Sequence, residues 1–241
     1  MKLLIDAGNT RIKWAFADGA DWLRSGALHT GQAGELSQCL AGLPDVQQIW
    51  VSNVAGAGVA RHIRDIGDAL RLEPRFIAAQ QAQCGVRNNY RNASQLGSDR
   101  WAALIAAWHL VGGDCLVVNS GTATTIDSLT AAGEFAGGLI LPGVELMQHS
   151  LQEATAGLEA VQGEYAAFPQ NTADAMYSGA IQACCGAIDR QRALSGDVDA
   201  PVVLSGGVAA QLQEHLNLPL RIVDNLVLQG LLLISREASE Q

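Results

Sequence analysis

Residues 3–16 read LLIDAGNTRIKWAF, and this stretch decides the fold of the chain. Residues 3–5 are apolar, residues 6–10 are of the kinds that form tight turns, and residues 11–16 alternate polar and apolar side chains. This order predicts a strand, a turn and a returning strand. Gly8 allows the backbone to turn tightly and to approach an anion. The turn is therefore a candidate phosphate site, although an ordinary polar hairpin turn has the same composition.

A second turn of the same kind opens the other half of the chain. Aligning residues 5–10 with residues 118–123 superposes a strand end, a short polar residue, a small residue and a glycine. Such a repeat predicts two α/β domains, residues 1–113 and 114–241, each presenting one turn. Apolar periodicity and capping residues predict the helices between the strands; these are expected near residues 35–43, 59–70, 97–111, 143–153, 173–194 and 225–236.

The composition excludes several classes of protein. The 241 residues carry a net charge of −9 and are only 16% charged, which argues against a nucleic-acid partner. No apolar run approaches the roughly 20 residues of a membrane span, and no secretory leader follows Met1, so we expect a cytoplasmic protein without a membrane partner. The only lysines are Lys2 and Lys13, and no Gly-Lys-Ser/Thr sequence occurs, so a P-loop is excluded.

Both turns carry residue types that suit a nucleotide phosphate. In the first turn, Asn9, Thr10 and exposed amides can donate to phosphate oxygens, and Lys13 is a nearby cation. Asp6 could hold a hydrated Mg²⁺, which commonly takes one or two carboxylates and shares its remaining positions with phosphates and water. Residues 119–125 of the second turn contain three threonines, a serine and a glycine. Close contact with a polar ligand explains this composition, and so does a plain threonine-rich strand.

Gly97-Ser98-Asp99-Arg100 opens a helix and contains a candidate general base. A serine or aspartate is the expected N-cap, and capping alone would explain both residues. A carboxylate there is also kept ionised by the helix dipole. Asp99 could thus accept a hydroxyl proton during phosphoryl transfer, and Arg100 could bind a substrate carboxylate bidentately.

Four motifs together resemble those of the type III pantothenate kinases. The first two are Asp6-x-Gly8-Asn9-Thr10, and Tyr90 followed by Gly97-x-Asp99-Arg100. The others are Gly121-Thr122-Ala123-x-Thr125-x-Asp127, and Asn171-Thr172. The resemblance covers nearly the whole chain and implies the actin-like superfamily of acetate and sugar kinases. This means an α/β fold of two ribonuclease-H-like domains with mixed sheets flanked by helices, a homodimer, and transfer of the ATP γ-phosphate to pantothenate in the first step of coenzyme A biosynthesis.

The resemblance also implies roles for individual residues. ATP would contact Asp6, Ala7, Gly8, Asn9, Thr10, Arg11, Ile12, Lys13 and Thr122. Pantothenate would contact Tyr90, Gly97, Ser98, Asp99, Arg100 and Thr172. Asp99 would be the general base, and Asp6 would hold Mg²⁺ through water. The family usually has an aspartate for a monovalent cation (K⁺ or NH₄⁺) where this chain has Asn119, whose amide oxygen can ligate a cation without supplying charge. Ala93 stands where a proline is usual.

Two other functions remain open on the same scaffold. A catalytically weak nucleotide-binding regulator would make Asn119 a sign of lost activity, and the acidic composition would then favour a protein partner. A phosphatase or polyphosphatase would release phosphate without a hydroxyl acceptor. Consumption of ATP only when pantothenate is added would distinguish the kinase from both.

Overall fold

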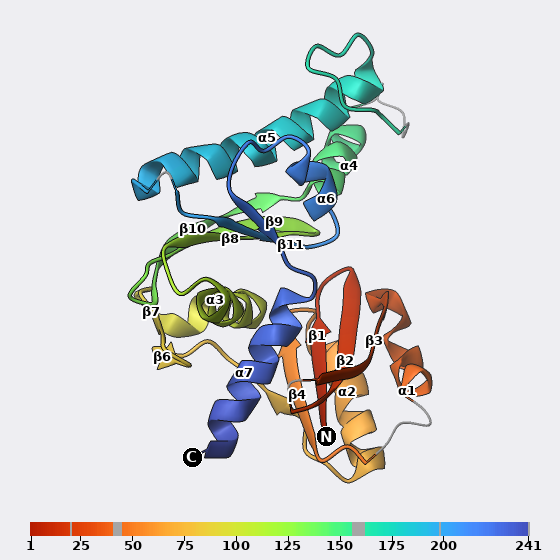
Figure 1. The fold of residues 1–241 in the computed structure, drawn as a ribbon. Coiled ribbons are helices and arrows are strands. Elements are labelled where there is room, and N and C mark those ends of the chain that lie inside the picture. Colours follow the sequence, from red (N-terminus) through yellow and green to blue (C-terminus); the bar gives the residue numbers. More distant parts are fainter. Residues whose placement is uncertain (20, 41–44, 156–161, 198, 241) are drawn as a thin grey trace. The chain divides into compact units, whose positions relative to one another are not determined.

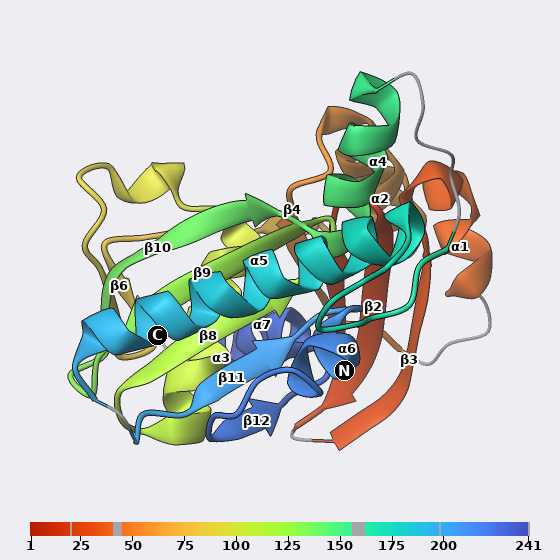
Figure 2. The same cartoon turned by 90° about the horizontal axis from the view of Figure 1, so that it is seen from above.

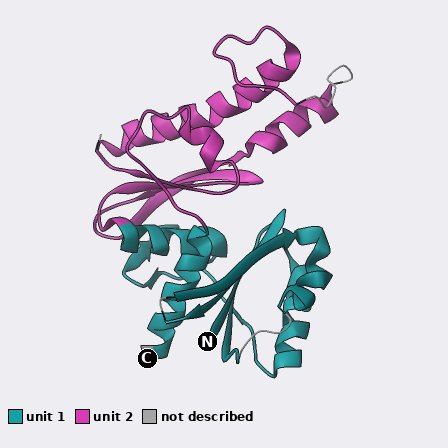
Figure 3. Ribbon diagram, turned by 45° about the vertical axis from the view of Figure 1, so that its right-hand side comes forward, with its two compact units in different colours: residues 1–110, 225–241 teal, residues 111–224 magenta. Residues whose placement is uncertain are grey.

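The chain forms two compact units in the computed structural model, which describes residues 1–19, 21–40, 45–155, 162–197 and 199–240 (Figure 3). Unit 1 contains residues 1–110 and 225–241, and unit 2 contains residues 111–224. The division after Leu110 lies close to the boundary expected after residue 113. The C-terminal helix α7 (Leu226–Glu240), in contrast, returns to unit 1, because it packs across strands β1, β2 and β4 of that unit.

Unit 1 is built on a mixed five-stranded sheet with the strand order β3-β2-β1-β4-β5 (Figure 1). Its strands are β1 (Lys2–Ala7), β2 (Arg11–Asp18), β3 (Asp21–His29), β4 (Gln48–Asn53) and β5 (Arg75–Phe76). The first three strands are antiparallel neighbours, whereas β4 runs parallel to β1 and β5 runs parallel to β4. The strand-turn-strand predicted for residues 3–16 is confirmed as β1 and β2.

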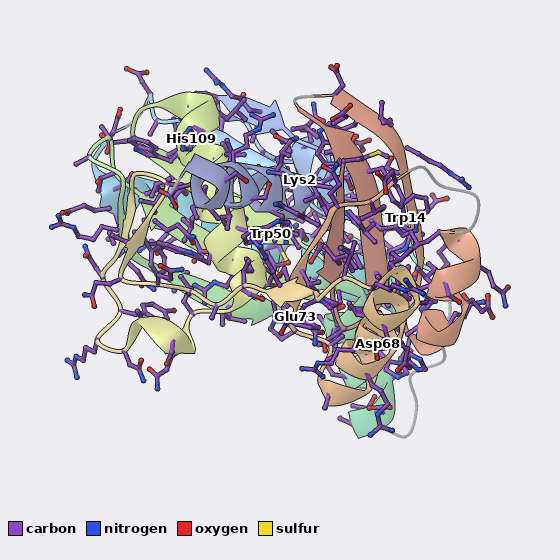
Figure 4. The ribbon with its side chains drawn as sticks, turned by 90° about the horizontal axis from the view of Figure 1, so that it is seen from below. Lys2, Trp14, Trp50, Asp68, Glu73 and His109 are labelled. Carbon is purple, nitrogen blue, oxygen red and sulfur yellow. The ribbon has the colours of Figure 1, made fainter. Side chains whose placement is uncertain are left out.

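The two faces of β1 pack against different helices. Leu3, Ile5 and Ala7 belong to a core that includes Ile63 of α2 (Ala57–Leu70). Lys2, Leu4 and Asp6 must point to the opposite face because side chains alternate along a strand. On that face the Lys2 ammonium donates to the backbone oxygen of Ser235 in α7 at 2.8 Å (Figure 4 labels Lys2). The same face therefore carries α7 and, at its far end, the Asp6 carboxylate.

Unit 2 repeats the strand order of unit 1. Its strands follow the order β12-β11-β8-β9-β10, with β8 antiparallel to β9 and parallel to β11. These strands are β8 (Cys115–Ser120), β9 (Ala123–Leu129), β10 (Glu134–Pro142), β11 (Val202–Ser205) and β12 (Leu220–Ile222). In both units the strand that ends in the glycine turn is the middle one of these five strands.

Three helices cover one face of the unit 2 sheet: α4 (Val144–Ala154), α5 (Thr172–Ser195) and α6 (Ala209–Gln213). Figure 2 shows the long α5 lying over the sheet, roughly along the direction of its strands. Side chains from the sheet and from all three helices form one buried cluster, including Val118, Val144, Ile181 and Leu212. None of the helices in the described ranges of the chain is long and apolar enough to cross a membrane.

Several local elements differ from the sequence-based expectations. In place of a helix over residues 35–43, a 3-10 helix (Thr30–Glu35) is followed by the four-residue α1 (Leu36–Cys39), and residues 41–43 lie outside the described ranges. The expected loop at residues 80–96 contains a short hairpin of β6 (Ala82–Gln83) and β7 (Val86–Asn88), and then the 3-10 helix η2 (Ala93–Gln95).

Candidate active site

The first glycine turn follows the end of β1 and is held in place by hydrogen bonds, including two from Thr30. The Gly8 amide donates to the Arg11 carbonyl at 3.0 Å and closes the turn. The Thr30 hydroxyl donates to the Gly8 carbonyl at 2.7 Å, and the Thr30 amide donates to the Thr10 carbonyl at 2.9 Å. Asn9 and Thr10 are exposed at the tip. The turn is therefore anchored at its base, while the residues at its tip stay exposed to solvent.

The Asp6 carboxylate lies near the end of β1 in a row of polar side chains. Its register partners are Lys13 on β2 and Ser52 on β4, so the three side chains emerge from the same face of the sheet. Burial, and after it the negative charge of the Asp99 carboxylate, raise the pKa of Asp6 from 3.8 to about 7, although the Lys13 ammonium opposes both effects. Asp6 is thus close enough to Asp99 for the two negative charges to repel each other.

This charge arrangement fits a divalent cation. A cation beside Asp6 would offset both the burial and the Asp99 repulsion that raise the pKa of Asp6, and a carboxylate is a ligand type that Mg²⁺ prefers. Nowhere in the described ranges do three His, Cys, Asp or Glu side chains gather in a way that could hold a metal ion. Phosphate oxygens and water would therefore have to supply the other ligands, as is usual for Mg²⁺ at nucleotide sites.

Asp99 belongs to the first turn of α3 (Ser98–Val111). Its Oδ1 atom accepts a hydrogen bond from the Arg100 amide at 2.8 Å, so the carboxylate satisfies one of the free amides of the helix start. A Cβ atom at position 97 would lie only 2.5 Å from this Oδ1. Gly97 thus leaves the space that the carboxylate occupies.

Arg100 and Tyr90 contact each other, although ten residues separate them. The Arg100 Nη1 donates to the Tyr90 hydroxyl at 3.2 Å, and its guanidinium carbon is 5.8 Å from the centre of the Tyr90 ring. The loop that carries Tyr90 is held by the buried Asn88. The Asn88 Oδ1 accepts a hydrogen bond from the Tyr90 amide at 3.1 Å, and the Asn88 Nδ2 donates to the Ala93 carbonyl at 3.2 Å. Arg100 is itself only 6% exposed, so its guanidinium has little freedom to move.

In unit 2, Asn119 occupies the position that Asp6 has in unit 1. It lies near the end of the middle strand, with Thr125 on β9 and Ser205 on β11 as register partners. The turn that follows is closed by the Gly121 amide, which donates to the Ala123 carbonyl at 3.0 Å, and Thr122 is exposed. Asn119 therefore places an amide in unit 2 at the position where Asp6 places a carboxylate in unit 1.

Two further glycine segments pack against the second turn. The Gly143 amide donates to the Thr122 carbonyl at 2.8 Å. Gly206 has a φ of 107°, and a Cβ atom there would lie 2.2 Å from the Ser120 carbonyl oxygen. Only glycine permits this close backbone approach. Sequence reasoning did not single out these segments, although Ser205-Gly206-Gly207 directly after a strand was an available signal.

Thr172 is the exposed first residue of α5. The preceding Asn171 caps the helix, since its Oδ1 accepts from the Asp174 amide at 2.9 Å. Asp174 Oδ1 in turn accepts from the Glu164 amide at 2.8 Å, which ties the incoming chain to the helix start. Thr122 and Thr172 belong to unit 2, whereas the other predicted contacts of ATP and pantothenate belong to unit 1.

An open cavity of about 640 Å³ in the described part of the chain does not coincide with the predicted site. It lies at the C-terminal end of α2, where Figure 4 labels Asp68 and Glu73. None of its lining residues is among the predicted site residues: Arg64, Asp68, Arg71, Leu72, Glu73, Pro74 and Phe76.

Fold and site together define the class of protein. Two mixed sheets that share one order of five strands, each flanked by helices, form the fold of actin-like ATPases and sugar kinases. A protein described as a Baf family transcriptional activator from Campylobacter jejuni has a TM-score of 0.61 at 23% identity, over 99% of this chain and 100% of that one. A protein described as a 2-dehydro-3-deoxygalactonokinase from Sinorhizobium meliloti has a TM-score of 0.61 at 15% identity, over 100% and 96%.

Sequence comparison then identifies the family. The sequence model of the type III pantothenate kinase family matches residues 2–193. The type III pantothenate kinase of Nitrosospira multiformis is 48% identical over 241 residues, covering 99% of this chain and 92% of that protein. The chain belongs to the type III pantothenate kinase family.

Proposed function

We propose that this chain phosphorylates pantothenate with ATP, giving 4'-phosphopantothenate in the first step of coenzyme A biosynthesis. One observation supports this beyond family membership. The carboxylate of Asp6, next to a turn of phosphate-binding composition, lies within electrostatic reach of Asp99 at the start of a helix. Phosphoryl transfer to a hydroxyl needs this combination of a metal-binding carboxylate, phosphate donors and a proton acceptor.

Asp99 is the proposed general base. The primary hydroxyl oxygen of pantothenate forms a bond to the γ-phosphorus of ATP, while the bond from that phosphorus to the β–γ bridging oxygen breaks. The hydroxyl proton passes to the Asp99 carboxylate, and ADP leaves with the bridging oxygen. Gly97 leaves room for this carboxylate, and the Arg100 amide orients it.

Arg100 is the proposed anchor of the pantothenate carboxylate. Its guanidinium is nearly buried and oriented by the Tyr90 hydroxyl, so little side-chain freedom is lost on binding. Ser98 on the same helix start, and Thr172 on the start of α5, complete the proposed substrate contacts together with Gly97.

ATP is proposed to bind the segment Asp6–Lys13, with Thr122 as a further contact. Asn9, Thr10 and the turn amides would donate to phosphate oxygens, and Lys13 would stabilise charge that develops during transfer. Asp6 would hold Mg²⁺ through water, and the metal when bound neutralises negative charge on the phosphates.

A monovalent cation, K⁺ or NH₄⁺, is proposed to bind at Asn119. Asn119 lies near the end of the middle strand of unit 2, as Asp6 does in unit 1, and this correspondence supports a role near phosphate. An amide oxygen supplies only a dipole, so we propose that this chain binds the cation more weakly than relatives that carry an aspartate there.

We propose a cytoplasmic homodimer in which Asp99 of one subunit and Thr172 of the other serve the same substrate. Large apolar side chains exposed on unit 2 support a subunit interface: Leu139, Ile140, Leu146 and Leu151. If each site combines two subunits, Asp99→Asn and Thr172→Arg proteins, each inactive alone, partly recover activity when they are co-refolded, because one site of the mixed dimer contains neither defect. A mixed dimer, verified by light scattering, that shows no recovery would refute the shared site.

The proposed function is tested by ATP consumption in three parallel reactions. ADP formation is measured with pantothenate, without an acceptor, and with a pantothenate analogue in which hydrogen replaces the primary hydroxyl. A pantothenate kinase forms ADP in the first reaction only. Equal phosphate release in all three would indicate a phosphatase, and no turnover in any of them would indicate a nucleotide-binding regulator.

A further inference from the structure

Ser52 is a buried hydroxyl-bearing residue that has no part in the proposed reaction so far. It lies near the end of β4, it is fully buried, and its register partner on β1 is Asp6. Lys13 is the partner of Asp6 on the other side. Register partners point to the same face of a sheet. A row of side chains, Lys13–Asp6–Ser52, therefore crosses the sheet beside the first phosphate turn.

This row is connected to the start of α3 by one hydrogen bond. The Ser52 Oγ is 2.9 Å from the Ser98 Oγ, and both side chains are excluded from water. Ser98 is the first residue of α3 and directly precedes Asp99. A bond between two buried hydroxyls is hard to break, because each would lose its partner without gaining water. The bond therefore fixes the beginning of α3 on the end of β4.

We infer that Ser52 is a positioning residue for phosphoryl transfer, which holds Asp99 at its working distance from Asp6 through Ser98. The inference rests on the proposed function, since it takes Asp99 as the base and Asp6 as the metal-binding carboxylate. Ser52 itself contacts neither substrate. Such support is needed because catalytic groups must be held within about 0.5 Å, and a misplacement of about 1 Å can slow a reaction about 100-fold.

The test compares Ser52→Ala with Ser235→Ala. Ser235 is a matched control, because it is equally buried and belongs to unit 1. Its hydroxyl donates to the Leu232 carbonyl at 2.7 Å within α7 and accepts from the Lys2 ammonium on β1 at 3.0 Å, so it too links a helix to a strand. We expect Ser52→Ala to lower kcat by about 10-fold to 100-fold while KM for both substrates changes less than about 3-fold. Ser235→Ala should keep kcat within about 2-fold of the wild type.

A second arm approaches the same bond from its other end. Ser98→Ala should lower kcat at least as much as Ser52→Ala, because it also removes a proposed substrate contact. The double variant should lose about as much as Ser98→Ala alone, because the bond between the two hydroxyls is broken only once. Calorimetry with a non-hydrolysable ATP analogue provides a readout without turnover, and its affinity should be unchanged in Ser52→Ala.

Three results would overturn the inference: a kcat of Ser52→Ala equal to that of Ser235→Ala, a loss that lies in KM or in analogue affinity, or multiplicative losses in the double variant. A wild-type protein that consumes no ATP with pantothenate refutes the proposed function instead. The two failures are therefore distinguishable.

Discussion

Replacement of Gly97 by alanine should lower the activity of the protein while leaving its stability nearly unchanged. The new Cβ atom would lie 2.5 Å from Asp99 Oδ1, whereas ordinary contact begins near 3.4 Å, so the carboxylate must retreat by about 0.9 Å. The atom that must move is the end of a side chain, and the next neighbour, Val54 Cγ1, is 3.9 Å away. The fold can therefore accommodate the methyl group while the proposed base is displaced.

We expect kcat of Gly97→Ala to fall by about 10-fold to 100-fold, since a displacement near 1 Å costs about that much. The free energy of unfolding should fall by no more than about 1 kcal/mol, the usual cost of alanine at a helix start. The assay is steady-state turnover with pantothenate, combined with thermal unfolding. Gly186→Ala is the control, because no atom lies within 4 Å of its added Cβ, and it should leave kcat unchanged. Wild-type turnover in Gly97→Ala would refute the idea that Asp99 needs this space.

Three further predictions concern single polar side chains. Asp99→Asn should lower kcat by about 10²–10⁴-fold while the free energy of unfolding changes by less than about 1 kcal/mol, because asparagine also caps helices well; near-normal turnover would leave Asp99 as a cap only. Burial, together with the Asp99 charge, raises the pKa of Asp6 to about 7, so the folded protein favours the neutral carboxyl. The stability that this preference contributes is fully present below pH 3.8 and is lost as the pH rises through 7. Without metal and nucleotide, Asp6→Asn should therefore be more stable than the wild type at pH 8, by about 2–4 kcal/mol, and similar to it near pH 4; a variant that is less stable at pH 8 contradicts this. Asn119→Asp should lower the K⁺ concentration needed for half-maximal activity, and an unchanged titration curve would show that this residue does not contact the cation.

The sequence predicted the elements whose pattern is local. The apolar run at residues 3–5 and the alternation that follows it were enough for β1 and β2, and Val59, Ile63 and Ile66 on one face were enough for α2. Strand β3 was missed because most of its side chains are exposed, so it shows little apolar alternation and is defined mainly by pairing with β2. Short elements such as α6 and β12 were missed because five and three residues carry too little periodicity.

The contacts of the candidate site could be predicted only in part. The resemblance to the kinase family implied that Tyr90 and Arg100 contact the same ligand, and the structure shows the two side chains in contact with each other. The hydrogen bond between Ser52 and Ser98 spans 46 residues and has no local signal. The return of α7 to unit 1, where Ser235 accepts from Lys2, depends likewise on packing between the two ends of the chain.

The central claim is that this chain moves the γ-phosphate of ATP onto the pantothenate hydroxyl. The most direct measurement is mass spectrometry of the products formed from pantothenate and ATP whose terminal phosphate carries ¹⁸O. The account predicts 4'-phosphopantothenate that retains three labelled oxygens, formed in equal amount to ADP and strongly reduced in Asp99→Asn. Labelled inorganic phosphate with unmodified pantothenate would contradict it.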